Sequence, residues 1–87
     1  MGLRIVSWDR TPNPNAMKAV IEGDPGRPRS YLSAEEASED PLAAALFAIE
    51  GVANVLIHER FITVGKRQDA RWGPIRRRAT AAIEGAL

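Results

Sequence analysis

The chain has 87 residues, of which 45% are apolar and 26% are charged, and this is the composition of one ordinary globular domain. It contains no cysteine and a single histidine, His58. These counts exclude a thiolate nucleophile, a disulfide framework, an iron-sulfur cluster held by this chain's own thiolates and any two-histidine metal motif. Catalysis is not expected, because one histidine leaves little material for proton transfer near neutral pH.

The net charge of +1 conceals a separation of sign along the chain. Residues 1–29 carry +2, residues 30–57 carry −5 and residues 58–87 carry +4. The acidic and basic segments either attract each other within the fold or present two faces to partners, and both interpretations stay open. A nearly neutral chain is not typical of a dedicated nucleic-acid-binding protein.

The sequence also predicts no contact with a membrane. The longest apolar run, residues 42–49, is eight residues long, whereas a spanning helix needs about 20. The first residues lack the apolar region of a signal peptide, and Val6 stands where a myristoylation pattern requires Ser or Thr. We therefore expect a cytoplasmic protein.

The first half of the chain predicts a strand pair and then a helix. Residues 3–8 and 16–22 are rich in branched and aromatic side chains, and the loop 23–28 has two glycines and two prolines. Residues 29–32 could add a short strand. A helix is predicted with Asp40 as its N-cap, Pro41 in its first position, the apolar residues 42–49 and Gly51 as its stop signal. Its buried face is expected to contain Leu42, Leu46 and Ile49.

The second half predicts a hairpin and a final helix. Residues 52–57 and 61–66 are strand-like and are separated by the three residues 58–60. A helix is expected to begin between Arg71 and Gly73, with Pro74 in its first turn. Its apolar stripe is Trp72, Ile75, Ala79, Ile83 and Leu87.

Together these elements predict an α+β fold: a single two-layer domain over residues 1–87, with an antiparallel sheet of about four strands and two helices packed on one face. We expect the hairpin of residues 52–66 to be the centre of the sheet. We also assign Phe61 and Trp72 to the core, and Phe47 and Trp8 to the core with Trp8 the more exposed.

The segment Thr11, Pro12, Asn13, Pro14, Asn15 is the first candidate for a functional surface. The two prolines fix their φ angles, and asparagine side chains form local turns with the backbone. The bland interpretation is a stiff turn between two strands. The alternative is a preorganised recognition loop that offers the amides of Asn13 and Asn15 to a partner.

The second candidate is the basic run Arg76, Arg77, Arg78. Such a run is usually a solvated helix face, and the alternatives are docking of an acidic partner or weak phosphate contact. A base-stacking platform is disfavoured, because the chain has only five aromatic residues and the core claims two of them. His58 reads as a turn residue and not as a metal ligand, and no G-x-S-x-G motif supports a serine hydrolase. We therefore assign no catalytic, cofactor or metal residue.

At this point the chain resembles the N-terminal domain of the NifU-like (Nfu) iron-sulfur scaffold proteins. The resemblance rests on T-P-N-P-N-A-M-K at residues 11–18, D-P-L-A at 40–43, L-F-A-I-E-G-V at 46–52, F-I-T-V-G-K at 61–66, and Asp69 with Trp72. These blocks follow the family's order and spacing. The chain departs from the family pattern at His58 and Arg60, and it has Asp40 where the family usually has a serine cap.

The resemblance implies a setting in iron-sulfur cluster assembly. It also implies that the C-x-x-C domain, whose thiolates hold the cluster in full-length Nfu proteins, is missing here. We expect a non-enzymatic accessory or protein-interaction module that is not a cluster ligand and needs no cofactor. Its expected partner is a protein, with a C-x-x-C iron-sulfur carrier as the candidate, and neither nucleic acid nor membrane. A stand-alone adaptor that recognises a peptide or an acidic surface, and a weak iron-binding domain, remain as alternatives.

Overall fold

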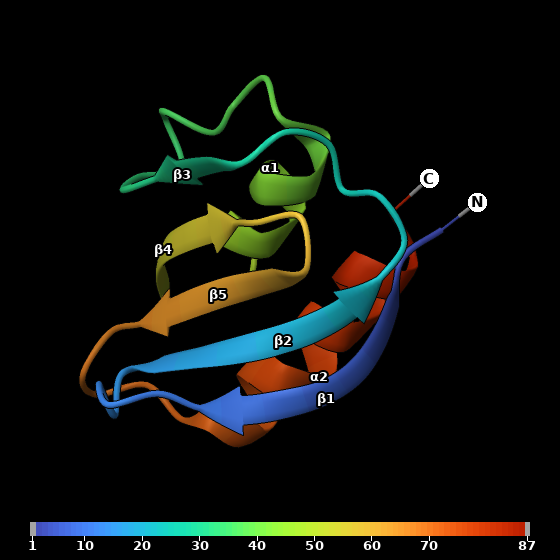
Figure 1. The fold of residues 1–87 in the computed structure, drawn as a ribbon. Helices are drawn as coiled ribbons and strands as arrows, with labels where there is room; N and C mark the ends of the chain where they lie inside the picture. The colour runs from blue at the N-terminus through green and yellow to red at the C-terminus, as the bar shows by residue number, and fades with distance from the viewer. Residues whose placement is uncertain (1, 87) are drawn as a thin grey trace.

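The computed structural model describes residues 2–86 as an antiparallel five-stranded sheet with two helices behind it (Figure 1). The strands are β1 (Arg4–Arg10), β2 (Ala16–Glu22), β3 (Arg29–Tyr31), β4 (Val52–Ile57) and β5 (Phe61–Lys66), and the helices are α1 (Pro41–Phe47) and α2 (Trp72–Glu84). The sheet order is β1-β2-β5-β4-β3. The predicted α+β class is confirmed, and the fifth strand is the short one expected near residue 30.

Strand β5 occupies the centre of the sheet, as the hairpin prediction requires. It pairs with β2 on one side and with β4 on the other, and every pairing in the sheet is antiparallel. The β4–β5 hairpin closes through the His58 N–H, which donates to the Phe61 carbonyl at 2.8 Å. The two outer strands, β1 and β3, are therefore the edges of the sheet.

The core lies between the sheet and the two helices. Alternate residues of β2, β4 and β5 point toward the helices, and each helix packs one stripe of apolar side chains against them. The predicted helix residues Leu42, Leu46, Ile49, Ile75, Ala79 and Ile83 are all buried. The predicted Leu87 lies outside the described residues. Trp8, Phe47 and Trp72 are half-buried and pack against the edge of this core.

Helix α1 is shorter than predicted. Asp40 caps it by accepting the Ala43 N–H at 3.2 Å, as expected, but the helix ends at Phe47 and not at Ile49. The Ile49 N–H bonds to the carbonyl three residues back, and this tighter turn leads into Gly51, whose φ is +96°. The glycine signal thus marks the turn into β4 and not the last turn of the helix.

Phe61 was assigned to the core and this prediction was wrong. Ile62 pairs with Ile57 in the β4–β5 register and both face the helices, so Phe61 must point to the open face of the sheet. There its ring stacks on His58, with centroids 4.5 Å apart and planes 11° apart, and the Lys18 ammonium lies 5.0 Å from its centroid.

One ion-paired network joins the loop 23–28, β3 and α1. The Arg29 guanidinium binds the Asp40 carboxylate through both Nε and Nη2, and its Nη1 donates to the carbonyls of Pro25 at 2.8 Å and Arg27 at 2.7 Å. The Tyr31 hydroxyl donates to the same carboxylate at 2.8 Å. The hydrogen bond from Arg29 is the main cause that lowers the pKa of Asp40 to about 2.

This network makes the free energy of unfolding depend on pH in the acidic range. The pKa of Asp40 is 3.8 when unfolded and about 2 when folded, so its contribution is complete above about pH 4 and is lost as the pH falls toward 2. Asp40→Asn should remove about 2 kcal/mol of unfolding free energy at neutral pH and converge with the unmodified chain near pH 2. Urea unfolding from about pH 6 to pH 2 measures this difference. Exposed Glu39→Gln is the control, and parallel curves for wild type and Asp40→Asn would contradict the assignment.

Neither helix among residues 2–86 combines the length and the hydropathy that a bilayer crossing demands.

Candidate functional site

The loop between β1 and β2 is held rigid by its own polar groups. The Thr11 hydroxyl accepts the Asn13 N–H at 3.1 Å, and its single proton can go to the carbonyl of Asn13 at 2.9 Å or of Ala16 at 3.1 Å. The Asn13 side-chain oxygen accepts the Asn15 N–H at 2.9 Å, which is the asparagine turn that the sequence predicts. The conformation of this loop is therefore set before any partner arrives.

Lys66 and Trp72 fasten the loop to the rest of the fold. The Lys66 ammonium donates to the side-chain oxygen of Asn15 at 3.1 Å, and its backbone N–H donates to the Asn15 carbonyl at 2.8 Å. The Trp72 indole N–H donates to the Pro14 carbonyl at 3.1 Å, and the Lys66 ammonium lies 5.8 Å from the Trp72 ring. The oxygens of both asparagine side chains are thus engaged internally, and Pro12, Asn13 and Pro14 form the exposed tip.

A shallow depression of about 330 Å³ opens between this loop and Trp72. We call it the loop hollow. Its walls are mostly apolar, with a single cation on the rim, and include Arg10, Pro12, Pro14, Met17 and Trp72. It can accept a small apolar group that has a negative charge beside it.

The basic run of α2 does not form one face. Arg76 and Arg77 lie with Trp8 and Thr80 around a second depression of about 220 Å³, which we call the β1–α2 hollow. Arg78 lines a different depression, on the side of α2 that faces Glu50. Each residue turns the helix by about 100°, so Arg78 points about 200° away from Arg76 around the helix axis.

Hydrogen bonds hold β1 against α2 at the β1–α2 hollow. The Trp8 indole N–H donates to the Thr80 hydroxyl oxygen at 3.1 Å, and that hydroxyl donates to the Arg76 carbonyl at 2.7 Å. The indole therefore forms a fixed wall. The arginine side chains above it remain exposed.

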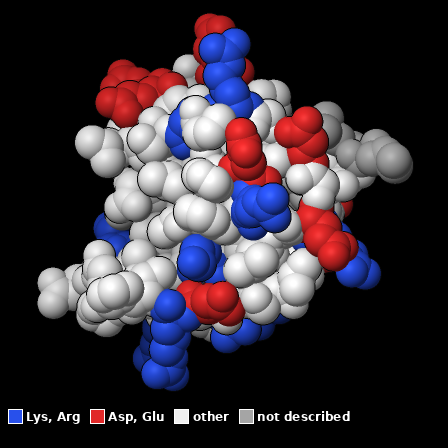
Figure 2. Space-filling view, in the orientation of Figure 1, with Lys and Arg blue, Asp and Glu red and all other residues white. Residues whose placement is uncertain are grey.

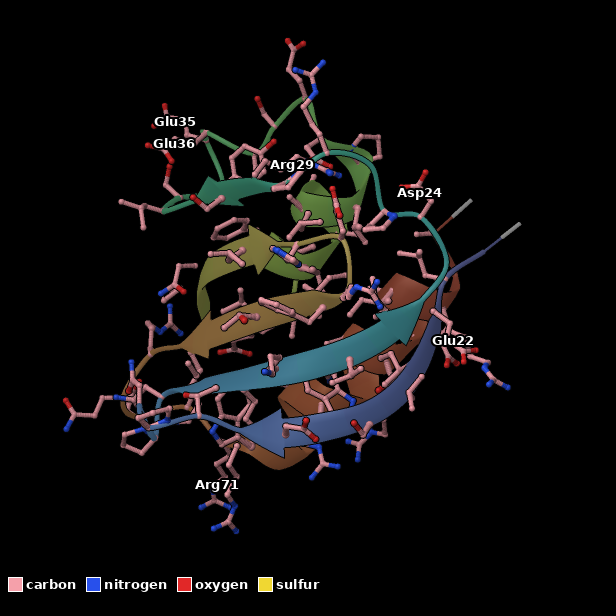
Figure 3. All side chains as sticks on the ribbon, viewed as in Figure 1. Glu22, Asp24, Arg29, Glu35, Glu36 and Arg71 are labelled. Carbon is pink, nitrogen blue, oxygen red and sulfur yellow. The ribbon has the colours of Figure 1, made fainter. Side chains whose placement is uncertain are left out.

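Three arginines at these two hollows have no ionic partner among residues 2–86. The ion pairs of that region involve Arg4, Arg29 and Arg67, and none involves Arg10, Arg76 or Arg77. We call these last three residues the arginine face. Figure 2 shows Lys and Arg side chains at the lower edge of the view, below β1 in Figure 1, and Figure 3 labels Arg71 among them.

Most of the acidic segment, residues 30–57, lies at the other end of the molecule. Figure 3 places Glu35 and Glu36 beyond β3 and Arg71 beyond β1, with the whole sheet between them. Of the two interpretations of the charge pattern, the structure therefore favours separate faces. Glu50 is a local exception, because it lines one depression with Arg67, Arg71 and Arg78 of the basic segment. The ion pair of Arg29 with Asp40 joins the first segment to the acidic one.

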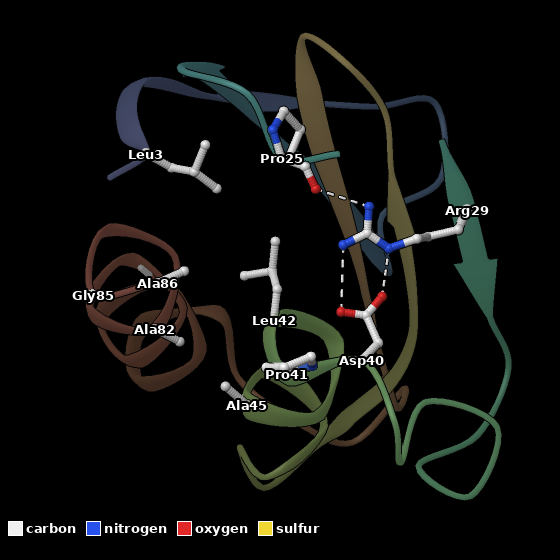
Figure 4. A pocket seen from close by; sticks show the side chains of 10 residues that line it. All are labelled: Leu3, Pro25, Arg29, Asp40, Pro41, Leu42, Ala45, Ala82, Gly85 and Ala86. Atoms are coloured by element: carbon white, nitrogen blue, oxygen red, sulfur yellow. Dashed lines mark hydrogen bonds and ion pairs between the residues drawn. The ribbon is translucent and has the colours of Figure 1, made fainter. Parts of the chain in front are cut away.

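A further depression, of about 400 Å³, lies between the start of α1 and the end of α2 (Figure 4). Leu3, Leu42 and Ala86 give it apolar walls. The Arg29–Asp40 pair closes one side, but its polar atoms are already bonded to each other. This depression offers a mainly apolar surface.

His58 takes part in the turn between β4 and β5. Its Nδ1 accepts the Arg60 N–H at 3.3 Å and its ring stacks on Phe61. Within residues 2–86 no three His, Asp or Glu side chains gather closely enough to hold a metal ion.

Sequence reasoning missed Trp8, Arg10 and Lys66 as parts of this surface. The α2 wall of the β1–α2 hollow could have been predicted from the spacing of Gly73, Arg76, Arg77 and Thr80, because residues three and four apart share a helix face. No short-range pattern could have placed Trp8 beside them, since 72 residues separate it from Thr80.

Comparison with known proteins identifies the family. The family model described as "Scaffold protein Nfu/NifU N terminal" matches residues 6–87. The chain belongs to the Nfu/NifU N-terminal family. The resemblance read from the sequence motifs is thereby confirmed.

Individual members of this Nfu/NifU N-terminal family show the same relationship. The NFU1 iron-sulfur cluster scaffold homolog of Drosophila willistoni, named as mitochondrial, is 37% identical over 88 residues, which cover 95% of this chain and 30% of the relative. The mitochondrial NifU-like protein 5 of Arabidopsis thaliana is 35% identical over 73 residues, or 77% of this chain and 25% of the relative. The chain therefore spans less than a third of these two relatives.

A solved structure of similar size has the same fold. The crystal structure of protein SAV1430 from Staphylococcus aureus superposes with a TM-score of 0.78 and 28% sequence identity. The match covers 93% of this chain and 99% of that one.

Proposed function

We propose that this domain is a non-enzymatic interaction module of iron-sulfur cluster assembly, which binds a protein partner and does not itself ligate the cluster. The observation that carries the proposal is the family match over residues 6–87. Its curated relatives are named as iron-sulfur cluster scaffold or NifU-like proteins. The chain has no cysteine to contribute thiolates, so a C-x-x-C carrier is the partner that would supply them.

The surface supports binding as the mode of action. A loop that is already ordered loses little conformational entropy when a partner docks on it. The neighbouring arginine face has no internal partner among residues 2–86 and can attract an acidic surface from a distance. We keep Thr11, Pro12, Asn13, Pro14 and Asn15 as the loop part of the proposed site, with Arg76 and Arg77 on the arginine face, and we place Arg78 outside it.

Capture of partners from the native cell tests this function. Immobilised domain should enrich proteins of iron-sulfur cluster assembly, and a C-x-x-C carrier among them. Enrichment of acidic proteins unrelated to iron would favour the stand-alone adaptor instead. We propose a cytoplasmic setting, as expected from the sequence, although the two curated relatives above are named as mitochondrial.

A second expected result is that the purified domain binds no iron-sulfur cluster. Clusters are held chiefly by cysteine thiolates, and one histidine cannot replace a set of them. Anaerobic reconstitution with iron and sulfide should leave the desalted domain colourless, while a C-x-x-C carrier treated alongside it gains a visible chromophore. A stoichiometric chromophore on the domain would contradict the proposal, and stoichiometric iron without sulfide would support the weak iron-binding alternative.

A further inference from the structure

We propose that the outer edge of β1 binds an extended acidic segment of a partner protein as an added strand, with its carboxylates on the arginine face. This inference rests on the proposed function only in taking the domain to be a protein-interaction module. It adds the chemistry of the partner and the way in which it binds.

The hydrogen bonds of β2 fix the direction of its backbone groups. The Ile21 N–H donates to the Arg60 carbonyl at 3.0 Å, on the β5 side of the strand. Since backbone groups alternate along a strand, Val20 and Lys18 direct theirs to the opposite side, where β1 lies. Strand β2 thus bonds to β1 through these two residues.

The same alternation leaves part of β1 unpaired. Ser7 lies opposite Val20 and Asp9 lies opposite Lys18, so these two residues of β1 bond inward. Trp8 and Arg10 alternate with them, and their N–H and C=O groups therefore point out of the sheet. Such an edge is a template for an added strand.

The other end of β1 is closed to pairing. The Ile5 N–H is taken by the Glu84 carboxylate at 3.1 Å, and the β1–β2 register shifts between Ile5 and Ser7. The shift leaves Val6 bulged and 55% exposed. A bulge ends regular pairing, so the open stretch begins after it and covers Ser7 to Arg10.

The side chains beside this open stretch select an acidic segment. Trp8 and Arg10 lie opposite Ala19 and Met17, which are buried on the helix side of the sheet, so both point toward α2. There Arg76 and Arg77 border the β1–α2 hollow next to Trp8. An added strand directs every second side chain to this same face. Glutamates at alternate positions would therefore lie on the same side of the sheet as Arg10, Arg76 and Arg77.

Two other occupants fit less well. A second copy paired edge to edge through a twofold axis would bring two arginine faces together, and like charges repel. A nucleic acid has no strand-like backbone to pair with Trp8 and Arg10. The indoles of Trp8 and Trp72 are half-buried and their N–H groups are hydrogen-bonded, so they make poor stacking platforms for bases. An acidic polypeptide satisfies both the backbone and the arginines.

Synthetic peptides of the length of β1, seven residues, test the inference directly. The probe alternates glutamate with valine, and the control has the same composition with the glutamates in one block and the valines in another. Fluorescence anisotropy at about 50 mM and about 0.5 M salt compares their affinities. The alternating peptide should bind at least roughly tenfold more tightly at low salt, and its affinity should fall at high salt. Amide shifts should map to Ser7–Arg10 and, on α2, to Gly73, Arg76, Arg77 and Thr80.

Charge reversal on α2 supplies the matched variants. Arg76→Glu with Arg77→Glu should weaken the alternating peptide by roughly tenfold or more. Arg78→Glu changes the same kind of residue on the same helix but outside the site, and it should leave the affinity within about twofold. Circular dichroism melting confirms that each variant is folded.

Several outcomes would overturn the inference. These are equal binding of the two peptides, equal weakening by Arg78→Glu, amide shifts away from β1, tighter binding of a single-stranded oligonucleotide at the same salt, and sedimentation as a dimer through β1. Because the peptides contain neither iron nor a cluster-assembly protein, their failure would leave the iron-sulfur setting intact. Conversely, a failed capture of cluster-assembly proteins would leave peptide binding intact.

Discussion

Gly51→Ala is expected to lower the free energy of unfolding by about 3 kcal/mol, a large share of the roughly 4 to 13 kcal/mol available to a chain of this size. Gly51 has a φ of +96°, a region that costs an alanine about 1 to 2 kcal/mol. The added Cβ would also lie 2.7 Å from the Ala70 Cβ and 3.3 Å from the Ile75 Cδ1. Relief of such crowding in a packed core costs about 1 to 3 kcal/mol more.

Gly73→Ala is the control for this prediction. An added Cβ at Gly73 meets nothing within 4 Å, and the residue lies in α2, where alanine is preferred to glycine. We expect this variant to be as stable as the unmodified chain or more stable by up to about 1 kcal/mol. Urea unfolding with unchanged slopes gives both values. Equal losses at the two glycines would contradict the argument from positive φ and crowding.

Trp72→Ala is expected to cost about 3 kcal/mol, near the lower end for a large aromatic side chain because Trp72 is only half-buried. The ring packs against the core, and its N–H holds the Pro14 carbonyl. Its loss should therefore also loosen the loop. Faster amide exchange at Asn13 and Asn15, measured with the urea midpoint, would show this second effect.

Trp72→Phe separates these two contributions. It keeps an aromatic ring on the core but removes the indole N–H. The free energy of unfolding should therefore fall by only about 1 kcal/mol, while amide exchange in the loop should still become faster. An unchanged midpoint for Trp72→Ala would contradict the structural role. The indole would then be a surface group available to partners.

Most of the fold could be predicted from the sequence because local signals agree with the final packing. Asp40 and Pro41 define the start of α1, and the spacing of Ile75, Ala79 and Ile83 defines the buried side of α2. The assignment of Phe61 to the core was wrong for a physical reason. Strand periodicity does not say which of two alternating sets faces the helices, and the register of the hairpin turn decides this.

The candidate site was only partly predictable. Alternating prolines and asparagines at residues 12–15 indicate a rigid loop, and the structure shows the hydrogen bonds of Asn13 and Asn15 that hold it. Helix geometry separates Arg76 from Arg78 by about 200°, but helix geometry alone groups Arg77 with Arg78, on the side away from Trp72. The structure instead places Arg77 with Arg76, because both border the hollow beside Trp8 of β1. The approach of Trp8 and Arg10 to α2 depends on the edge position of β1, which no local pattern encodes.

Quantitative co-purification from the native cell with three versions of the domain tests the central claim most directly. The versions are the unmodified chain, Arg76→Glu with Arg77→Glu, and Arg78→Glu. A C-x-x-C iron-sulfur carrier should be enriched equally with the first and third versions and strongly reduced with the second. Absence of any iron-sulfur assembly protein with the folded unmodified domain, or equal recovery with all three versions, would contradict the account.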